Sequence, residues 1–182
     1  MIRTALLALV ILAGPARAEV LTTLVPAQSR IAFSYSQMGV ALEGRFAAFT
    51  GQVSFDPTRL QTARARIEVR LASIDTGLAE ADAEVAGKDW FNTAAHPLAL
   101  FESTALKALG GNRYQVDGRL TIKGRTQTVS APFTYTPDRL GGVFDGTFKL
   151  RRADFAIGEG VWRDFSVVGN EIAVRFHLRV TR

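Results

Sequence analysis

Apolar and polar side chains alternate one by one along most of the chain after residue 30. Ile31, Phe33 and Tyr35, for example, are separated by Ala32 and Ser34. A period of two is typical of a β-strand with one buried face. Turn residues such as Asp-Pro, Gly-Gly-Asn and Lys-Gly separate the alternating runs. The pattern predicts strands over residues 30–36, 41–46, 51–55, 66–71, 98–106, 113–122, 128–135, 142–150 and 172–180.

Residues 78–88 break this alternation. The segment is rich in Ala and Glu, and Leu78, Ala81 and Val85 recur near helical spacing. We expect a short helix here, leading into Trp90 and Phe91.

The predicted elements describe one domain, because the chain contains no internal repeat, low-complexity tract or linker. Eight or more mostly antiparallel strands, each polar on one face, indicate a sandwich or a closed barrel. The interior of an eight-stranded barrel is either filled by side chains or holds one small ligand. The alternation does not distinguish these two interiors.

The first 18 residues have the pattern of a secretory signal peptide. Arg3 gives a cationic start, residues 5–13 are apolar, and Ala16-Arg17-Ala18 forms an A-x-A cleavage signal. The apolar stretch is about half of the roughly twenty residues that span a bilayer. We therefore expect cleavage after Ala18 and a soluble exported protein, most simply in a bacterial periplasm, whose mature chain is residues 19–182.

Composition narrows the chemistry. The chain of 182 residues is 47% apolar and 21% charged, which is typical of a globular protein. It has no Cys, which excludes disulfides, thiolate nucleophiles and iron–sulfur clusters. The net charge of +5 is spread thinly. No run of basic residues is interleaved with aromatic ones, so nucleic acid is not a predicted partner.

The sequence offers few candidates for catalytic or metal-binding residues. His96 precedes Pro97 in a turn-like stretch and His177 falls on the polar face of the last strand, so capping or surface roles are expected. Gly-x-Ser-x-Gly, Walker and Gly-x-Gly-x-x-Gly motifs are missing from the sequence. Two groups of acidic residues remain. Glu80, Asp82 and Glu84 are expected on a solvated helix face. Nothing in the sequence shows that Asp154, Glu159 and Asp164 converge. We predict no catalytic residue, metal or cofactor.

The abundance of aromatic residues has two readings. The chain has 12 Phe and 2 Trp. Such residues ordinarily form the core, but some of them could instead line a long apolar cavity. The pattern alone does not assign single residues to either role.

Several short motifs follow one another in a fixed order. They are Ser73-Ile74-Asp75-Thr76-Gly77, Lys88-Asp89-Trp90-Phe91-Asn92, residues 97–104, Gly118 to Thr126 with Val129, and Leu150 to Gly158, preceded by residues 29–33, Gly44, Phe46, Gly51 and Phe55-Asp56. In order and spacing this set resembles the YceI family of exported polyisoprenoid-binding proteins, over essentially the whole of residues 19–182. Two departures are Asn92, where the family often has Asp, and Ala156, where it often has Gly.

The resemblance implies an all-β fold with one short helix, a lipocalin-like antiparallel eight-stranded β-barrel. It implies that the barrel encloses an isoprenoid chain, such as a quinone tail or a polyprenyl phosphate, without catalytic residues or metal. The expected function is a periplasmic carrier that sequesters this lipid. A homodimer and transient contact with a membrane are left open by the sequence.

The residues expected to bind the tail are those on the inward faces of the strands, together with two aromatic residues that follow the helix. They are Ile31, Phe33, Val53, Phe55, Ile67, Val69, Leu71, Trp90, Phe91, Leu120, Ile122, Phe133, Phe148, Ile172, Val174 and Phe176. Arg151 and Arg152 follow a strand. A solvated strand end is the favoured reading for both, and contact with an anionic head group is the alternative.

Two rival functions remain. A lipocalin-like barrel can host an isomerase or cyclase, because fold does not fix function. An interaction protein could instead have a filled barrel and a functional outer surface, and it would retain no lipid.

Overall fold

The computed structural model describes residues 21–182. The expected signal peptide and the cleavage site after Ala18 lie outside the described residues. The strands are β1 (Leu21–Leu24), β2 (Arg30–Gln37), β3 (Val40–Phe46), β4 (Phe49–Phe55), β5 (Arg64–Arg70), β6 (Ile74–Asp75), β7 (Leu98–Gly110), β8 (Arg113–Ile122), β9 (Arg125–Pro137), β10 (Gly141–Arg151) and β11 (Glu171–Thr181). The helix α1 spans Ala79–Ala86, and the 3₁₀ turns are η1 (Pro26–Gln28), η2 (Leu60–Thr62), η3 (Leu71–Ser73), η4 (Arg152–Phe155) and η5 (Gly160–Arg163).

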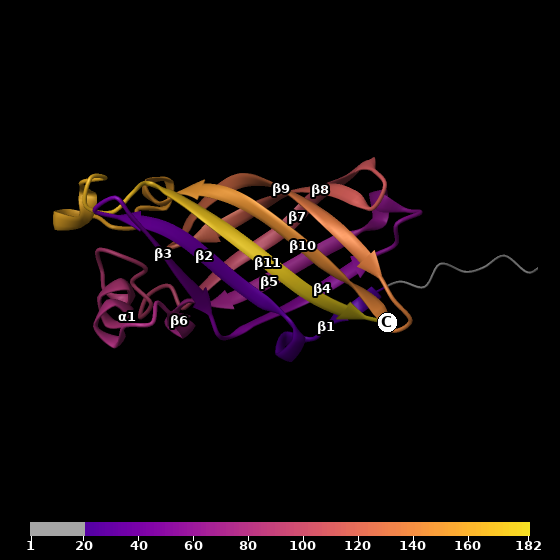
Figure 1. The fold of residues 1–182 in the computed structure, drawn as a ribbon, viewed down its shortest axis with the longest axis horizontal. Coiled ribbons are helices and arrows are strands. Elements are labelled where there is room, and N and C mark those ends of the chain that lie inside the picture. Colours follow the sequence, from indigo (N-terminus) through magenta and orange to yellow (C-terminus); the bar gives the residue numbers. More distant parts are fainter. Residues whose placement is uncertain (1–20) are drawn as a thin grey trace, which may run out of the picture.

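The strands form one antiparallel sheet that closes on itself through the pairing of β1 with β11 (Figure 1). β1 and β2 both pair with β11, and on their other side β1 pairs with β4 and β2 pairs with β3. β5 and β6 likewise continue along β4 and β3. Each of these three couples therefore acts as one long bent strand, and the barrel has eight. The lipocalin-like fold that was expected from the sequence is confirmed.

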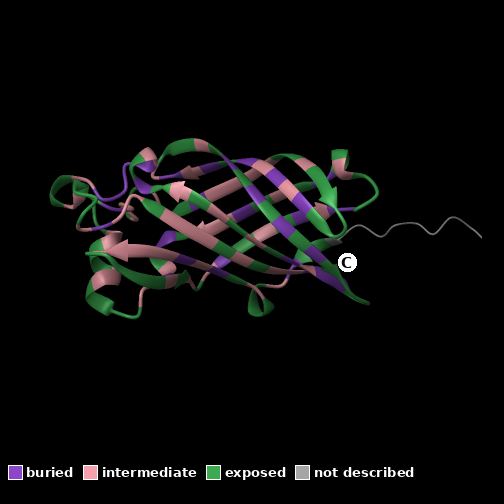
Figure 2. Ribbon diagram, turned by 45° about the horizontal axis from the view of Figure 1, so that its top comes forward, coloured by how far each residue is buried: buried purple, intermediate pink, exposed green. Residues whose placement is uncertain are grey.

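Closure fixes which side chains face inward. Buried and exposed residues alternate along the strands (Figure 2), as expected for a sheet with one face inside the barrel. β9 shows this clearly, because Val129, Ala131, Phe133 and Tyr135 are all buried while the residues between them are exposed. The period-two pattern of the sequence thus determines the inner wall.

One end of the barrel is filled by aromatic side chains. The Phe55 ring lies 4.9 to 5.5 Å, between centroids, from those of Tyr114, Tyr135 and Phe144. Phe133 stacks on Tyr114 at 5.4 Å. This end, called the plugged end below, carries the turns at residues 56–63, 111–112 and 138–140. Edge-to-face packing of this kind closes the barrel there.

The opposite end carries α1, the β2–β3 turn and the segment 152–170, and it is called the helix end below (Figure 1). The expected helix over 78–88 is observed as α1. Leu71, expected at the end of a strand, lies instead in η3, because this 3₁₀ turn interrupts the long β5–β6 strand. Its side chain is nevertheless fully buried. Within residues 21–182, no helix has the length and apolar character that crossing a bilayer requires.

Candidate ligand-binding cavity

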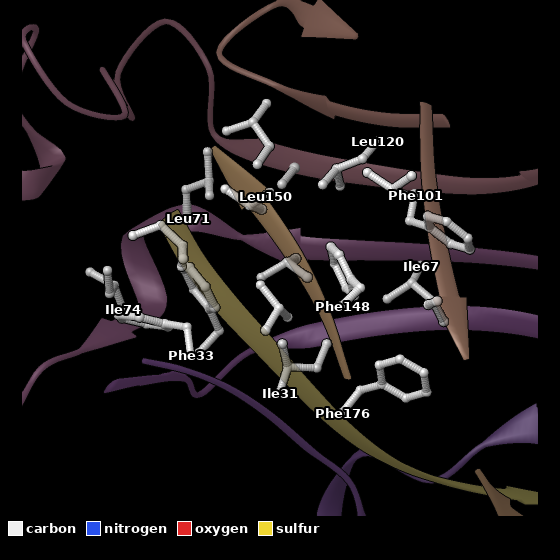
Figure 3. A pocket seen from close by; sticks show the side chains of 18 of the residues that line it. Ile31, Phe33, Ile67, Leu71, Ile74, Phe101, Leu120, Phe148, Leu150 and Phe176 are labelled. Atoms are coloured by element: carbon white, nitrogen blue, oxygen red, sulfur yellow. The ribbon is translucent and has the colours of Figure 1, made fainter. Parts of the chain in front are cut away.

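The barrel encloses an apolar cavity of about 500 Å³. Inward side chains from β2, β5, β7, β8, β10 and β11 form its wall, including Ile31, Ile67, Phe101, Leu120 and Phe148 (Figure 3). Volumes of roughly 300–1,000 Å³ are typical of small-molecule sites. The interior is therefore not filled by side chains, which argues against the filled-barrel alternative.

All sixteen residues expected to bind a lipid tail lie at the cavity wall. The structure brings together positions from Ile31 to Phe176 because barrel closure places the first and last strands side by side. That these residues contact a ligand stays a prediction, and the cavity is the site where such contact would occur.

Sequence reasoning missed further lining residues of two kinds. The first kind shares the inward alternation of the predicted strands and could have been found from it: Tyr35, Phe46, Phe101, Leu106, Val116, Val129, Ala131, Phe144, Leu150 and Leu178. The second kind comes from helix or loop segments that carry no period-two signal: Glu80, Glu84, Arg152, Ile157, Trp162 and Val168.

The helix α1 contributes one face to the cavity, formed by Glu80, Ala81, Glu84 and Val85. Ala and Glu favour the helical conformation. The helix is held to the end of β6 by Asp82, whose Oδ1 accepts hydrogen bonds from the Thr76 hydroxyl at 2.7 Å and from its backbone N–H at 2.8 Å. Glu80 and Glu84 are exposed, as expected for a solvated helix face, whereas the half-buried Asp82 anchors the helix.

Both tryptophans of the chain line the cavity at this end. Their ring centroids lie 5.5 Å apart. Trp162, in η5, donates its indole N–H to Glu84 Oε1 at 2.7 Å, which links η5 to α1. Trp90 is 8% exposed, and its indole N–H has no acceptor. A buried donor without an acceptor is uncommon in a folded protein.

The expectation that Arg152 lies at a solvated strand end is wrong, because this residue is only 1% exposed. Its guanidinium donates five hydrogen bonds, all to backbone carbonyls of the segment 157–169. The acceptors are Ile157 and Gly158 for Nη1 (both 2.8 Å), Trp162 and Val168 for Nη2 (2.7 and 2.8 Å), and Gly169 for Nε (3.2 Å). Burial lowers the pKa of Arg152, but an arginine stays protonated in proteins. Arg151, in contrast, is exposed and pairs with Asp154, as a solvated strand end would.

Tyr35 also faces the cavity. Burial, and secondarily the negative charge of Asp82, raise the pKa of its hydroxyl above the ordinary value of 10.0. The phenol is therefore neutral at physiological pH and adds no charge to the wall.

The other titratable candidates, His177, Glu159 and Asp164, lie outside the cavity wall. His177 Nδ1 lies 2.7 Å from Asp145 Oδ1 at half-exposed positions, and neither residue lines the cavity. Glu159 pairs with Lys123, and Asp164 accepts from the Ser166 backbone. In the part of the chain that the structure describes, no three side chains of His, Cys, Asp or Glu converge so as to hold a metal ion.

Comparison with known proteins gives consistent matches. The family model of the YceI-like domain matches residues 23–180. A UPF0312 protein of Azotobacter vinelandii is 31% identical over 147 residues, which cover 77% of this chain and 74% of the relative. The crystal structure of Burkholderia cenocepacia BcnA superposes with a TM-score of 0.82 at 40% identity, covering 85% of this chain and 98% of BcnA. A protein of Saccharophagus degradans described as a polyisoprenoid binding domain has a TM-score of 0.67 at 16% identity, over 90% of this chain and 99% of that one.

Proposed function

Because the chain belongs to the YceI family, we propose that it binds an isoprenoid lipid and encloses the lipid tail in the barrel cavity. The observation that carries this proposal is the cavity of about 500 Å³, whose wall is almost entirely aliphatic and aromatic. Aromatic packing closes the cavity at the plugged end, and the exposed Glu80 and Glu84 border it at the helix end. A tail would therefore enter at the helix end and point toward Phe55.

The energetics suit such a ligand. Burial of a methylene group contributes about 0.8 kcal/mol, so each five-carbon unit gives roughly 3–4 kcal/mol before the cost of ordering the tail. A few units supply useful affinity without an elaborate polar site. The cavity wall combines branched aliphatic side chains of Ile, Val and Leu with Phe rings, and these suit the branched, unsaturated tail of an isoprenoid.

The cellular role follows from the expected signal peptide. An isoprenoid tail is insoluble in an aqueous compartment, so a soluble exported barrel would serve as its carrier in the periplasm. Quinones and polyprenyl lipids are the natural classes with such tails. We propose binding rather than catalysis, since the cavity wall holds no pair of groups arranged as acid and base.

Native mass spectrometry of the exported protein, purified without detergent, tests the proposal. A stoichiometric adduct whose mass fits an isoprenoid lipid is the expected result. An unliganded mass that persists after addition of geranylgeraniol, a tail of four units with a hydroxyl head, would refute the proposal.

A pair of variants locates the ligand. Val174 lines the cavity and pairs across the sheet with Phe148, while the neighbouring Thr147 is exposed on the outside of β10. Val174→Phe should narrow the cavity and weaken tail binding at least tenfold. Thr147→Phe adds an aromatic ring outside and should leave binding unchanged. Equal binding by both variants would place the ligand elsewhere. Formation of a product from the bound lipid would favour the enzyme alternative.

A further inference from the structure

We propose that the head group of the bound lipid lies at the helix end and is uncharged, so that the cavity selects isoprenoid alcohols, phenols or quinones against isoprenyl phosphates. This inference rests on the proposed function and deepens it. It comes from the charged and polar groups of the cavity wall, which gather mostly at one end: Gln37, Thr76, Glu80, Glu84, Trp90, Arg152 and Trp162.

Arg152 is the cation of this group, and it is not available to a phosphate. A guanidinium has five N–H donors, and each of them is used by a backbone carbonyl. Binding of an anion would have to break some of these bonds and leave buried carbonyls without a donor. Such groups are costly to leave unpaired. Arg152 therefore holds the segment 157–169 in place and does not serve as an anion site.

The other arginine of the cavity wall, Arg64, lies at the start of β5, away from the helix end. Its Nη1 donates to the carbonyls of Gln61 and Ala63 at 3.0 and 2.7 Å. Arg64 thus turns back toward its own chain, and a head group at the helix end is out of its reach.

Apart from Arg152, the charges that border the cavity at the helix end are negative. Glu80 and Glu84 are one turn apart on the same face of α1, as expected for residues at i and i+4. A phosphate in this position would meet two carboxylates and no free cation of the cavity wall. A hydroxyl could instead donate to either carboxylate.

Trp90 supplies a donor that points to the same class of ligand. Its side chain is more than nine-tenths buried at the cavity wall, and its indole N–H lacks an acceptor. Its ring lies beside that of Trp162, which is bonded to Glu84. The indole nitrogen itself is buried, so a carbonyl or hydroxyl oxygen at the helix end would satisfy this single N–H once the ring turns toward the ligand. One neutral donor suits such an oxygen, whereas a phosphate needs several donors or a cation.

The test compares two ligands with the same tail, geranylgeraniol and geranylgeranyl phosphate. Because both tryptophans line the cavity, intrinsic fluorescence reports binding without a label. We expect the alcohol to bind at least tenfold more tightly than the phosphate. Equal or tighter binding of the phosphate would overturn the inference while leaving the proposed function intact. Failure of both ligands to bind would refute the proposed function itself.

Variants separate the contributions. The double change Glu80→Gln and Glu84→Gln keeps an oxygen for the Trp162 N–H and removes both charges. It should bring the ratio of the affinity for geranylgeraniol to that for geranylgeranyl phosphate below half of its wild-type value. Glu102→Gln, which removes a charge on the outer face beside Arg66, is the matched control and should not alter the preference. An unchanged preference in the double variant would contradict the role of the two carboxylates.

Trp90→Phe tests the indole donor, because it removes the N–H and keeps an aromatic ring. We expect the alcohol to bind about fivefold more weakly, as for one lost hydrogen bond. Phytane, a saturated isoprenoid hydrocarbon without a head group, should bind equally to both proteins. If Trp90→Phe weakened the binding of phytane by the same factor, the indole ring would be shown to pack against the tail, and its N–H to have no partner on the ligand.

Discussion

The guanidinium of Arg152 lies over the indole ring of Trp90, with its central carbon 5.7 Å from the ring centroid. On another side it lies 5.1 Å from the centroid of Phe165. A cation over an aromatic face is attracted by the ring quadrupole. Together with its five carbonyl acceptors, this arrangement joins the end of β10, the segment after α1 and the segment 157–169 into one cap over the helix end.

Replacement of Arg152 should therefore destabilise the cap. Arg152→Met removes five hydrogen bonds from a charged donor, each worth roughly 1.5–3 kcal/mol when measured singly. We expect the free energy of unfolding to fall by at least about 3 kcal/mol in urea denaturation, since such losses are not additive. Arg151→Met is the matched control, and its exposed ion pair with Asp154 should change stability by less than about 0.5 kcal/mol. A similar loss in both variants would contradict this account.

Inward glycines make room for aromatic rings in the wall. A methyl group on Gly118 would lie 2.4 Å from Phe101 Cε2 and 2.7 Å from the backbone oxygen of Glu102. We expect Gly118→Ala to cost about 1–3 kcal/mol of stability, as overpacking typically does, and to push the Phe101 ring into the cavity. Thermal unfolding and ligand titration measure the two effects. Gly169→Ala meets only ordinary contacts of 3.4 Å or more and should be nearly neutral by comparison.

Ala156, which ends η4, has a left-handed backbone with φ of 54° and ψ of 39°. The turn is thus formed despite the Cβ atom, at an expected cost of about 1–2 kcal/mol. Ala156→Gly should raise the free energy of unfolding by up to about 1 kcal/mol, because loss of the buried methyl offsets part of the relief. Ala153→Gly, at an exposed position of η4, should instead lower it. A lower melting temperature for Ala156→Gly would show that the methyl contact outweighs the strain.

Asp56 makes stability depend on pH in the acid range. Hydrogen bonds from the Thr58 side chain and from Arg59 hold the pKa of its carboxyl at about 2, below the ordinary 3.8. A carboxyl whose pKa is lower in the folded state contributes stability above the ordinary pKa and loses it as the pH falls through the folded value. Asp56→Asn should therefore melt at a lower temperature than the wild type at pH 7. The gap should close between about pH 4 and pH 2, and a gap that persists at pH 2 would assign the effect to geometry and not to charge.

The alternation of apolar residues determined the strands and their inner faces, because a strand exposes successive side chains on opposite sides whatever its partners are. Val174 and Phe176, for instance, are assigned to the interior by this alternation alone. Asn92 is a similar local case, since its left-handed backbone, with φ of 50°, is one that Asn adopts readily.

Only the tertiary structure decided that the interior holds a cavity and where its ends lie. Phe133 and Phe148 have the same alternation in sequence, yet Phe133 belongs to the buried aromatic cluster of the plugged end while Phe148 is only partly buried. The sequence left the role of Arg152 open, because the carbonyls that saturate it are backbone groups of an irregular segment. Backbone acceptors cannot be recognised from the pattern of side chains along the sequence. The space inside a barrel depends on how the strands close around it.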